Sequence, residues 1–190
     1  MIIGITGGSG SGKTTLLDFF REKGAVIFDC DRIYHNLLET DRDLQLSLEN
    51  RFPQAFAKGK LQRKILGQIV FSDEEALKDL NRITHQRVKD EILKALSSQP
   101  ALAVIDAIGL FEGELHQLCD ITVAVCAPME DRVSRLVIRD GITPEYALNR
   151  IRAQKSDAWY AQHCDYVLSN NTTAQAFREK CIAFWETLSI

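Results

Sequence analysis

The chain has 190 residues and a formal net charge of -3, with 45% apolar and 26% charged residues. This composition is typical of a soluble globular protein with one compact core and room for at most a small additional unit. The small negative charge excludes a general attraction to nucleic acid or to an anionic membrane. No apolar run approaches the length of a membrane span.

The N-terminus and the cysteines predict a cytoplasmic protein. No basic region followed by a long apolar stretch begins the chain, so we expect no secretory signal. The five cysteines are odd in number and none has C-x-x-C spacing, so neither a disulfide framework nor a zinc site is predicted. A reducing compartment fits this usage best.

The first predicted elements are a buried strand at residues 2–6 and a helix at residues 14–23. Between them the chain reads G-G-S-G-S-G-K-T-T at residues 7–15, which matches the phosphate-binding loop that follows a strand and opens a helix. Backbone N–H groups at such a helix start bind phosphate, and glycine and serine leave them accessible. The predicted ATP-binding residues of this loop are Gly8, Ser9, Gly10, Ser11, Gly12, Lys13, Thr14 and Thr15.

Two side chains of the loop have predicted chemical roles. Lys13 is expected to reach the β- and γ-phosphates, and the Thr14 hydroxyl is expected to bind Mg²⁺. The loop therefore predicts ATP and Mg²⁺ as cofactors. It does not by itself distinguish a kinase from a nucleotide-dependent switch.

Apolar segments alternate with helical patterns along the rest of the chain, which predicts an α/β fold with a mainly parallel sheet. Residues 32–99 are helical and interrupted, and this block is too long for one crossover, so we expect a helical subdomain. Within it, residues 73–96 predict a long helix with Ser72 as N-cap and Glu75 completing a capping box. The predicted strands are residues 2–6, 25–28, 102–106, 121–126 and 166–169.

Carboxylates follow two of these strands. Asp29 and Asp31 come at the end of the second strand, where ligands bind in open parallel sheets. From the residues alone a catalytic or metal-binding role and a simple helix cap are about equally favoured. Asp106 ends the third strand, at the position from which a carboxylate holds Mg²⁺ in nucleotide enzymes of this kind.

Residues 106–109 also spell D-x-x-G, the motif of a GTPase switch. A GTPase would need a guanine signature after a late strand, and residues 170–173 read N-N-T-T, without the required lysine and aspartate. We therefore interpret the D-x-x-G match as coincidental.

Arginines recur on the two helical patterns that follow the fourth strand. Phosphoryl transfer develops negative charge that arginines on a mobile lid can stabilise. Thr143 is a predicted N-cap with Pro144 at the first helical position of the second helix. A lid is thus predicted at about residues 129–163, and the alternative is a solvated charged face. The arginines are Arg132, Arg135, Arg139, Arg150 and Arg152.

Taken together, the chain resembles the dephospho-coenzyme A kinase family over nearly its whole length. The resemblance implies a three-layer α/β P-loop kinase fold with a five-stranded parallel sheet, a helical acceptor-binding subdomain and a helical lid. The corresponding ranges are a core at about 1–30, 100–128 and 164–190, an acceptor region at about 32–99 and the lid. The motifs are T-G-G-S-G-S-G-K-T-T at 6–15, F-D-C-D at 28–31, L-Q-R at 61–63, L-N-x-I-T-H at 80–85, D-x-x-x-L-F-E at 106–112, R-D-G-I-T at 139–143, R-x-x-x-Q at 150–154 and D-x-V-L-S-N-N at 165–171.

The family transfers the γ-phosphoryl of ATP to the ribose 3′-hydroxyl of dephospho-coenzyme A, the last step of coenzyme A synthesis. The resemblance implies that Asp31 orients the acceptor hydroxyl as a base and that Arg139 is a lid arginine near the phosphates. It further implies that Asn170 and Asn171 lie near the adenine. The residues it implies for the acceptor are Arg63, His85 and Glu112, together with Asp31.

The chain departs from the family pattern at two places. Ile108 and Gly109 stand where the family usually has proline and leucine, and residues 159–164 lack a basic residue that the family usually carries. The sequence therefore predicts an ATP-dependent kinase of a small-molecule hydroxyl, most consistent with dephospho-coenzyme A, working without nucleic acid or membrane and favoured to be a monomer. The alternatives are another nucleoside or nucleotide kinase and a nucleotide-dependent switch.

Overall fold

The structure is a computed structural model that describes residues 1–188 apart from the side chain of Phe71, and its largest sheet is a parallel β-sheet. Within these residues a sheet of five strands has the order β2-β5-β1-β6-β7. β1 pairs in parallel with β5 and β6, and β6 pairs in parallel with β7, which confirms the predicted α/β class. The strands are β1 (Ile2–Thr6), β2 (Val26–Asp29), β5 (Ala103–Asp106), β6 (Ile121–Cys126) and β7 (Tyr166–Ser169).

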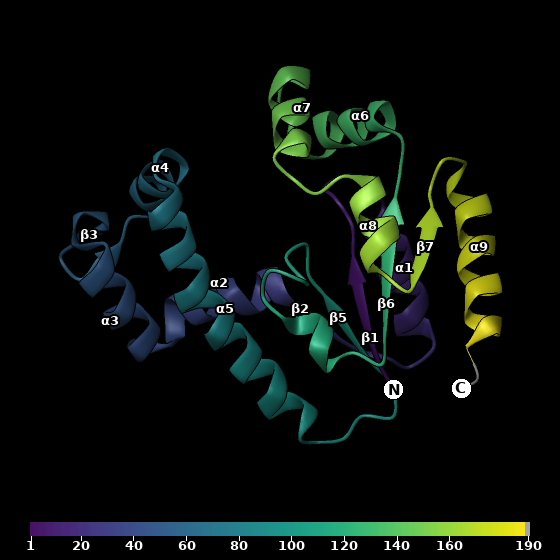
Figure 1. The fold of residues 1–190 in the computed structure, drawn as a ribbon, viewed down its shortest axis with the longest axis horizontal. Helices are drawn as coiled ribbons and strands as arrows, with labels where there is room; N and C mark the ends of the chain where they lie inside the picture. Colours follow the sequence, from purple (N-terminus) through teal and green to yellow (C-terminus); the bar gives the residue numbers. More distant parts are fainter. Residues whose placement is uncertain (189–190) are drawn as a thin grey trace. The chain divides into compact units, whose positions relative to one another are not determined.

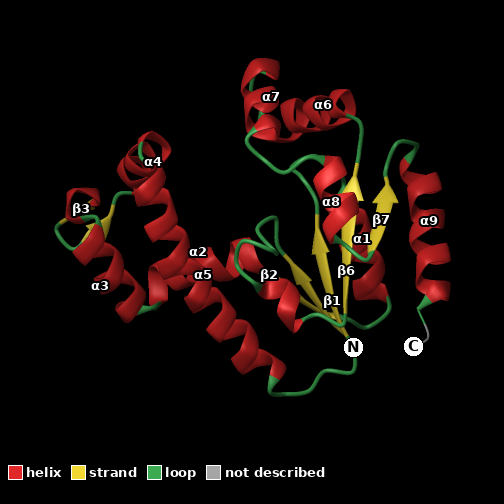
Figure 2. Cartoon of the chain, viewed as in Figure 1, coloured by secondary structure: helices red, strands yellow, loops and turns green. Residues whose placement is uncertain are grey.

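Helices cover both faces of this sheet (Figures 1 and 2). On one face α1 (Lys13–Glu22) packs against α9 (Ala174–Thr187), and on the other α8 (Asp157–His163) packs against β6 and β7. Successive side chains of a strand point to opposite faces. Accordingly, Val123 and Val125 of β6 pack with α1 and α9, whereas Ala124 and Cys126 pack with Tyr160 of α8.

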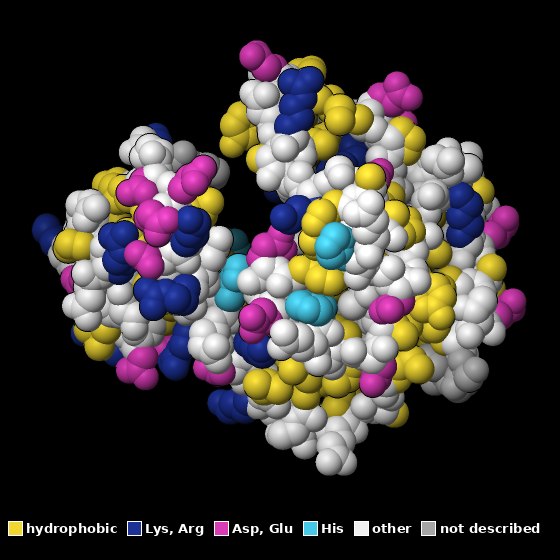
Figure 3. All heavy atoms as spheres, in the orientation of Figure 1, with side chains coloured by type: hydrophobic (Ala, Val, Ile, Leu, Met, Phe, Trp, Pro, Cys, Tyr) yellow, Lys and Arg dark blue, Asp and Glu magenta, His cyan; other side chains and the backbone are white. Residues whose placement is uncertain are grey.

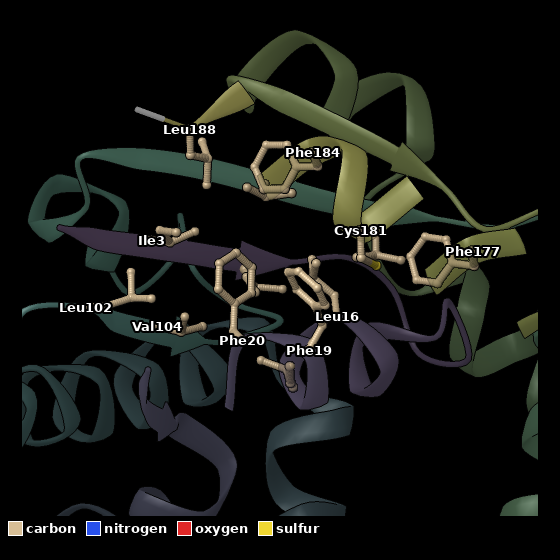
Figure 4. Close-up of a cluster of buried hydrophobic side chains, with 14 residues drawn as sticks. Ile3, Leu16, Phe19, Phe20, Leu102, Val104, Phe177, Cys181, Phe184 and Leu188 are labelled. Atoms are coloured by element: carbon tan, nitrogen blue, oxygen red, sulfur yellow. The ribbon is translucent and has the colours of Figure 1, made fainter. Parts of the chain in front are cut away.

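The main core lies between the sheet and the α1–α9 pair (Figure 4). Ile3 of β1, Leu16 and Phe20 of α1, and Phe177 of α9 are all fully buried. Burying each such side chain contributes about 1.5–3 kcal/mol relative to leaving it exposed. This packing fixes both β1 and α1, and therefore both ends of the glycine-rich segment that joins them.

Two further helices follow β6. α6 (Met129–Asp140) ends at Gly141, whose φ of 65° is favourable for glycine, and α7 (Pro144–Arg152) follows. Thr143 caps α7, with its hydroxyl accepting a hydrogen bond from the Tyr146 N–H, which confirms the predicted start of this helix. The two helices share a small core made of Leu136, Ala147 and Ile151.

The chain divides into two compact units, residues 1–28 with 100–190, and residues 29–99. The second unit is mainly helical. On the face drawn in Figure 3, its surface carries acidic and basic side chains interspersed with one another. Its elements are α2 (Cys30–Thr40), α3 (Arg42–Arg51), the 3₁₀ turn η1 (Pro53–Ala55), the short hairpin β3 (Phe56–Ala57) and β4 (Lys60–Leu61), α4 (Arg63–Ser72) and α5 (Glu74–Leu96).

The predicted cap of the long helix α5 is wrong by one residue. Asp73, not Ser72, is the N-cap, and its carboxylate accepts hydrogen bonds from the N–H groups of Glu75 and Ala76. Ser72 instead ends α4, where its hydroxyl donates back to the Gln68 carbonyl. The Asp73 carboxylate accepts the free N–H groups at the start of the helix in place of the Ser72 hydroxyl, so the predicted capping box does not form.

Helix α8 was not predicted, because seven residues are too few to display helical periodicity. In the described part of the chain, no helix combines the length and apolar character that a membrane crossing requires. All five cysteines fall within that part, and each is a free thiol.

Candidate functional site

The glycine-rich segment forms a tight loop between β1 and α1. Gly10 and Gly12 have φ values of 77° and 94°, in the left-handed region that favours glycine, and α1 begins directly afterwards at Lys13. The Ser11 N–H donates to the Gly8 carbonyl at 3.2 Å, which closes a turn within the loop. The loop thus presents the start of a helix, where unpaired N–H groups and the helix dipole favour an anion.

The Lys13 ammonium lies back over this loop and donates to the Gly7 carbonyl at 2.7 Å. The Ser11 hydroxyl is buried and has no hydrogen-bond partner among the described residues. A buried polar atom of this kind carries a cost that a ligand oxygen can remove. The loop therefore has the cation and the donors that a polyphosphate requires.

Ser9 is held by two side chains from the region that follows β6. Its N–H donates to Gln154 Oε1 at 2.8 Å, and its hydroxyl accepts from Gln154 Nε2 at 2.8 Å. Its carbonyl accepts from Arg132 Nε at 3.0 Å. Arg132, on α6, also donates to Gln154 Oε1 at 3.2 Å, so the three residues form one network.

The next two carbonyls of the loop are held in the same way. Arg135 of α6 donates to the carbonyls of Gly10 and Ser11, at 3.1 and 3.2 Å. The side-chain amide of Asn170, which follows β7, donates to the Ser11 carbonyl at 2.8 Å and is buried. Segments distant in sequence thus meet on the backbone of the loop.

This packing gives the glycines a second role beside access for phosphate. A Cβ at Gly8 would lie 1.9 Å from Arg132 Nη2, and a Cβ at Gly12 would lie 2.1 Å from Asn170 Nδ2. Neither distance is possible for real atoms. A side chain at either position would therefore displace the side chains that support the loop, or move the loop itself.

Asp106 and Thr14 belong to the same unit as the loop. Asp106 ends β5 and pairs in register with Ile5 of β1, the strand that leads into the loop. Thr14 is exposed in the first turn of α1. A carboxylate and a hydroxyl are oxygen donors of the kind that Mg²⁺ prefers, so the residues fit this ion.

Arg139 lies on α6 one turn beyond Arg135, and it is paired with Asp140. Its Nε and Nη2 reach the two carboxylate oxygens at 2.6 and 3.0 Å, and Arg150 of α7 reaches the same carboxylate at 2.9 Å. The hydrogen bond from Arg139 holds the pKa of Asp140 below its ordinary value. The predicted contact of Arg139 with phosphates stays a prediction.

The two aspartates that follow β2 have different local roles. Asp29 is the N-cap of α2, and its carboxylate accepts from the Arg32 N–H at 3.0 Å. Asp31 is exposed in the first turn of the same helix. The cap that sequence alone could have assigned to Asp31 is therefore supplied by Asp29, and Asp31 is left for another role.

Three predicted acceptor residues lie in the helical unit, on α2, α4 and α5. Arg63, at the start of α4, donates to Glu39 of α2 at 3.0 Å and lies 3.3 Å from His35 Nδ1. His85 is half-buried on α5, which packs against both α2 and α4. Asp31, Arg63 and His85 therefore lie on three helices of one unit, and α5 packs against the other two helices.

Glu112, the fourth predicted acceptor residue, lies in the other unit beside an aromatic cluster. Lys155 approaches the Glu112 carboxylate at 3.8 Å and also lies over the Trp159 ring. Trp159 stacks on His163 at 3.9 Å between ring centroids and meets Phe111 edge to face. Figure 3 shows histidine and apolar side chains gathered over α8. The segment that departs from the family pattern therefore forms a packed surface.

The predicted adenine residues follow β7. Asn171 accepts from Lys180 of α9 at 3.1 Å, and Asn170 is the buried donor to the Ser11 carbonyl. Gln154 was not predicted as a site residue, and Arg132 was predicted only as a lid arginine. The spacing R-x-x-x-Q was the only signal for Gln154, since burial at the loop cannot be deduced from local pattern.

Comparison with known proteins was consistent with this geometry. The family model described as dephospho-CoA kinase matches residues 1–176. A dephospho-CoA kinase of Thermus thermophilus is 36% identical over 175 residues, which cover 90% of this chain and 83% of the relative.

Two solved structures extend the similarity to three dimensions. The crystal structure of TT1252 from Thermus thermophilus matches with a TM-score of 0.85 and 32% identity, covering 100% of this chain and 98% of the other. A dephospho-CoA kinase from Campylobacter jejuni matches with a TM-score of 0.68 and 26% identity, covering 97% and 95%. The similarity therefore includes nearly the whole of each chain.

Proposed function

The chain belongs to the dephospho-CoA kinase family, and from this premise we propose how its own residues divide the work of the reaction. The enzyme is a nucleotide-dependent phosphotransferase with an alcohol acceptor, and its product is coenzyme A. The observation that carries the assignment of roles is the loop at residues 7–12, with left-handed glycines that lead into a helix beginning at Lys13. The family resemblance implies several of the roles proposed below, and the position of each side chain supports them.

The loop and Lys13 bind the phosphates of ATP in this proposal. The helix start supplies N–H donors, and the Lys13 ammonium exchanges the Gly7 carbonyl for the β- and γ-phosphate oxygens. The buried Ser11 hydroxyl gains a partner when a phosphate enters. Arg139 leaves Asp140 and stabilises the charge that develops on the transferred group.

Thr14 and Asp106 hold Mg²⁺ in this proposal. Their hydroxyl and carboxylate oxygens suit that ion, and β5 lies next to the strand that leads into the loop. When bound, the ion supplies neutralisation of phosphate charge. The residues themselves orient the triphosphate relative to the loop.

Asp31 is the base for the acceptor. It accepts the proton of the ribose 3′-hydroxyl while that oxygen forms its bond to the γ-phosphorus, and the bridging oxygen leaves with ADP. Its exposure, and the capping of α2 by Asp29 instead, support this role. Arg63 and His85 of the same unit, with Glu112, bind the acceptor.

A panel of acceptors tests this function. ADP formation from ATP and Mg²⁺ is measured with dephospho-CoA, several nucleosides, several nucleotides and no acceptor. Turnover that depends on dephospho-CoA, with coenzyme A identified by mass spectrometry, is the expected result. Turnover with a nucleoside but not with dephospho-CoA would contradict it, and hydrolysis that no acceptor changes would indicate a switch.

We also propose that the chain acts as a cytoplasmic monomer. Arg132 and Asn170 of the same chain hold the carbonyls of the phosphate loop, so this support requires no second copy. The five cysteines are free thiols, as a reducing compartment would keep them. Light scattering of the purified chain is expected to give a mass near 21.4 kDa. A mass of twice that value at micromolar concentration would exclude the monomer.

A further inference from the structure

We propose that Arg132 and Gln154 are positioning residues of the phosphate loop. Their hydrogen bonds hold Ser9 on the side of the loop away from the ligand, so that the loop N–H groups face a bound triphosphate. The inference rests on the proposed role of the loop in binding ATP. The inference gives Arg132 a different role from the lid arginines, because Arg132 binds the backbone of the loop and does not bind the nucleotide.

Every polar atom of Ser9 is engaged by these two side chains. Gln154 accepts from the Ser9 N–H and donates to the Ser9 hydroxyl, both at 2.8 Å, while Arg132 Nε donates to the Ser9 carbonyl at 3.0 Å. Ser9 is only 4% exposed. Its N–H is thus committed to protein, and the residue serves as the anchor of the loop.

Fixing the Ser9 carbonyl also fixes the next N–H group. In a trans peptide the C=O of one residue and the N–H of the following residue point in opposite directions, and no peptide in the described chain is cis. The bond from Arg132 therefore turns the Gly10 N–H to the other side of the loop. By the same geometry, Arg135 and Asn170 turn the Gly12 N–H through the Ser11 carbonyl.

The surroundings of Arg132 exclude a direct role on phosphate. Its side chain is 5% exposed, and its donors reach Ser9, Gln154 and, at 3.7 Å, the carboxylate of Asp157. By contrast the Arg139 side chain is 59% exposed. A buried guanidinium between a carbonyl and two side-chain oxygens is placed to orient the loop and to polarise its peptides.

The experiment measures binding of inorganic tripolyphosphate and of ATP by calorimetry, on the full chain with Mg²⁺. Tripolyphosphate reports on the phosphate cradle alone. The variants are Arg132→Gln, Arg132→Lys, Gln154→Ala and Ser9→Ala, with Arg178→Gln as the control, since Arg178 is a surface arginine of α9 paired with Glu22. Thermal unfolding of each variant is recorded in parallel.

We expect Arg132→Gln and Gln154→Ala each to raise the Kd of both ligands at least tenfold, with the KM for the acceptor within twofold of wild type. Arg132→Lys keeps the charge but not the planar fork of donors, so it is expected to stay impaired. Ser9→Ala, which loses only the hydroxyl contact, should change the Kd less than threefold.

Several results would overturn the inference. Unchanged tripolyphosphate binding by a folded Arg132→Gln would do so, as would full rescue by Arg132→Lys with wild-type behaviour of Gln154→Ala, because charge alone would then suffice. If Arg132→Gln fails to fold, Gln154→Ala, which changes no charge, tests the inference by itself. Unchanged tripolyphosphate binding by that variant would then overturn it. Absence of ATP binding by the wild-type chain would instead refute the proposed function of the loop.

Discussion

The substitution Gly8→Ala tests the packing behind the phosphate loop. The new methyl carbon would lie 1.9 Å from Arg132 Nη2, 2.7 Å from its Cζ and 3.0 Å from Gln154 Oε1. Because the Arg132 side chain is buried, its guanidinium must give up a bond to Ser9 or Gln154, or the loop must move. Losing a charge-assisted hydrogen bond costs about 1.5–3 kcal/mol, and overpacking costs a similar amount.

Thermal unfolding and ATP binding measure the effect. In a chain of this size each kcal/mol lowers the Tm by about 2–4 °C, so a cost near 2 kcal/mol predicts a fall of roughly 4–8 °C. The displaced loop should also raise the Kd for ATP about tenfold. Gly109→Ala is the matched control for stability, because a Cβ there would meet its nearest atom at an ordinary 3.9 Å.

The reasoning is refuted if Gly8→Ala unfolds at the wild-type temperature and binds ATP as well as wild type. It is also refuted if Gly109→Ala is equally destabilised. A loss of ATP binding without loss of stability would indicate that the methyl group obstructs the nucleotide and does not displace Arg132.

Three further predictions concern other parts of the chain. Asp31→Asn is expected to lower kcat at least a hundredfold while ATP still binds, and full activity in that variant would exclude Asp31 as the base. Burial raises the pKa of Asp41, but its backbone hydrogen bonds and the bonds from Arg87 outweigh burial and hold that pKa below the ordinary 3.8. The stability that this pair contributes is therefore present above pH 4 and lost as the pH falls through the lowered value. Asp41→Asn should lower the free energy of unfolding in urea by about 1–2 kcal/mol at pH 7 and should weaken the loss of stability at acidic pH. An unchanged pH dependence of stability below pH 4 would contradict the pairing. Burial raises the pKa of the Cys119 and Cys126 thiols to about 12. Iodoacetamide at pH 8 should leave both unmodified until urea unfolds the chain, and rapid alkylation of the folded protein would contradict the low reactivity that the raised pKa predicts.

Local pattern was sufficient for the strands and for the phosphate loop. Each depends on a short segment: apolar β-branched residues at 2–6, then glycines at the spacing of a helix start. Local pattern was insufficient where neighbouring residues compete for one role: the predicted cap of α5 was wrong, and the residues alone left the role of Asp31 open. Ser72 and Asp73 are both good caps, as are Asp29 and Asp31, and only the observed first turn of each helix distinguishes them.

The support of the loop could not be predicted from the sequence, because it depends on residues that are far apart in the chain. Arg132 follows its partner Ser9 by 123 positions, and Gln154 follows it by 145. An arginine at helical spacing is compatible with a lid, with a solvated face or with a buried position from which it supports the loop backbone. Only burial and hydrogen-bond geometry separate these roles, and both come from the tertiary structure.

The same separation has a consequence for synthesis on the ribosome. The loop is among the first segments made, yet Asn170, which holds the Ser11 carbonyl, is added 159 residues later. At about 5–20 residues per second this interval lasts on the order of ten seconds or more. A nascent chain therefore contains the complete phosphate-loop sequence well before it contains the residues that stabilise the conformation of the loop. Ribosome-bound fragments ending before residue 170 should bind ATP poorly, since nucleotide affinity is acquired late in translation.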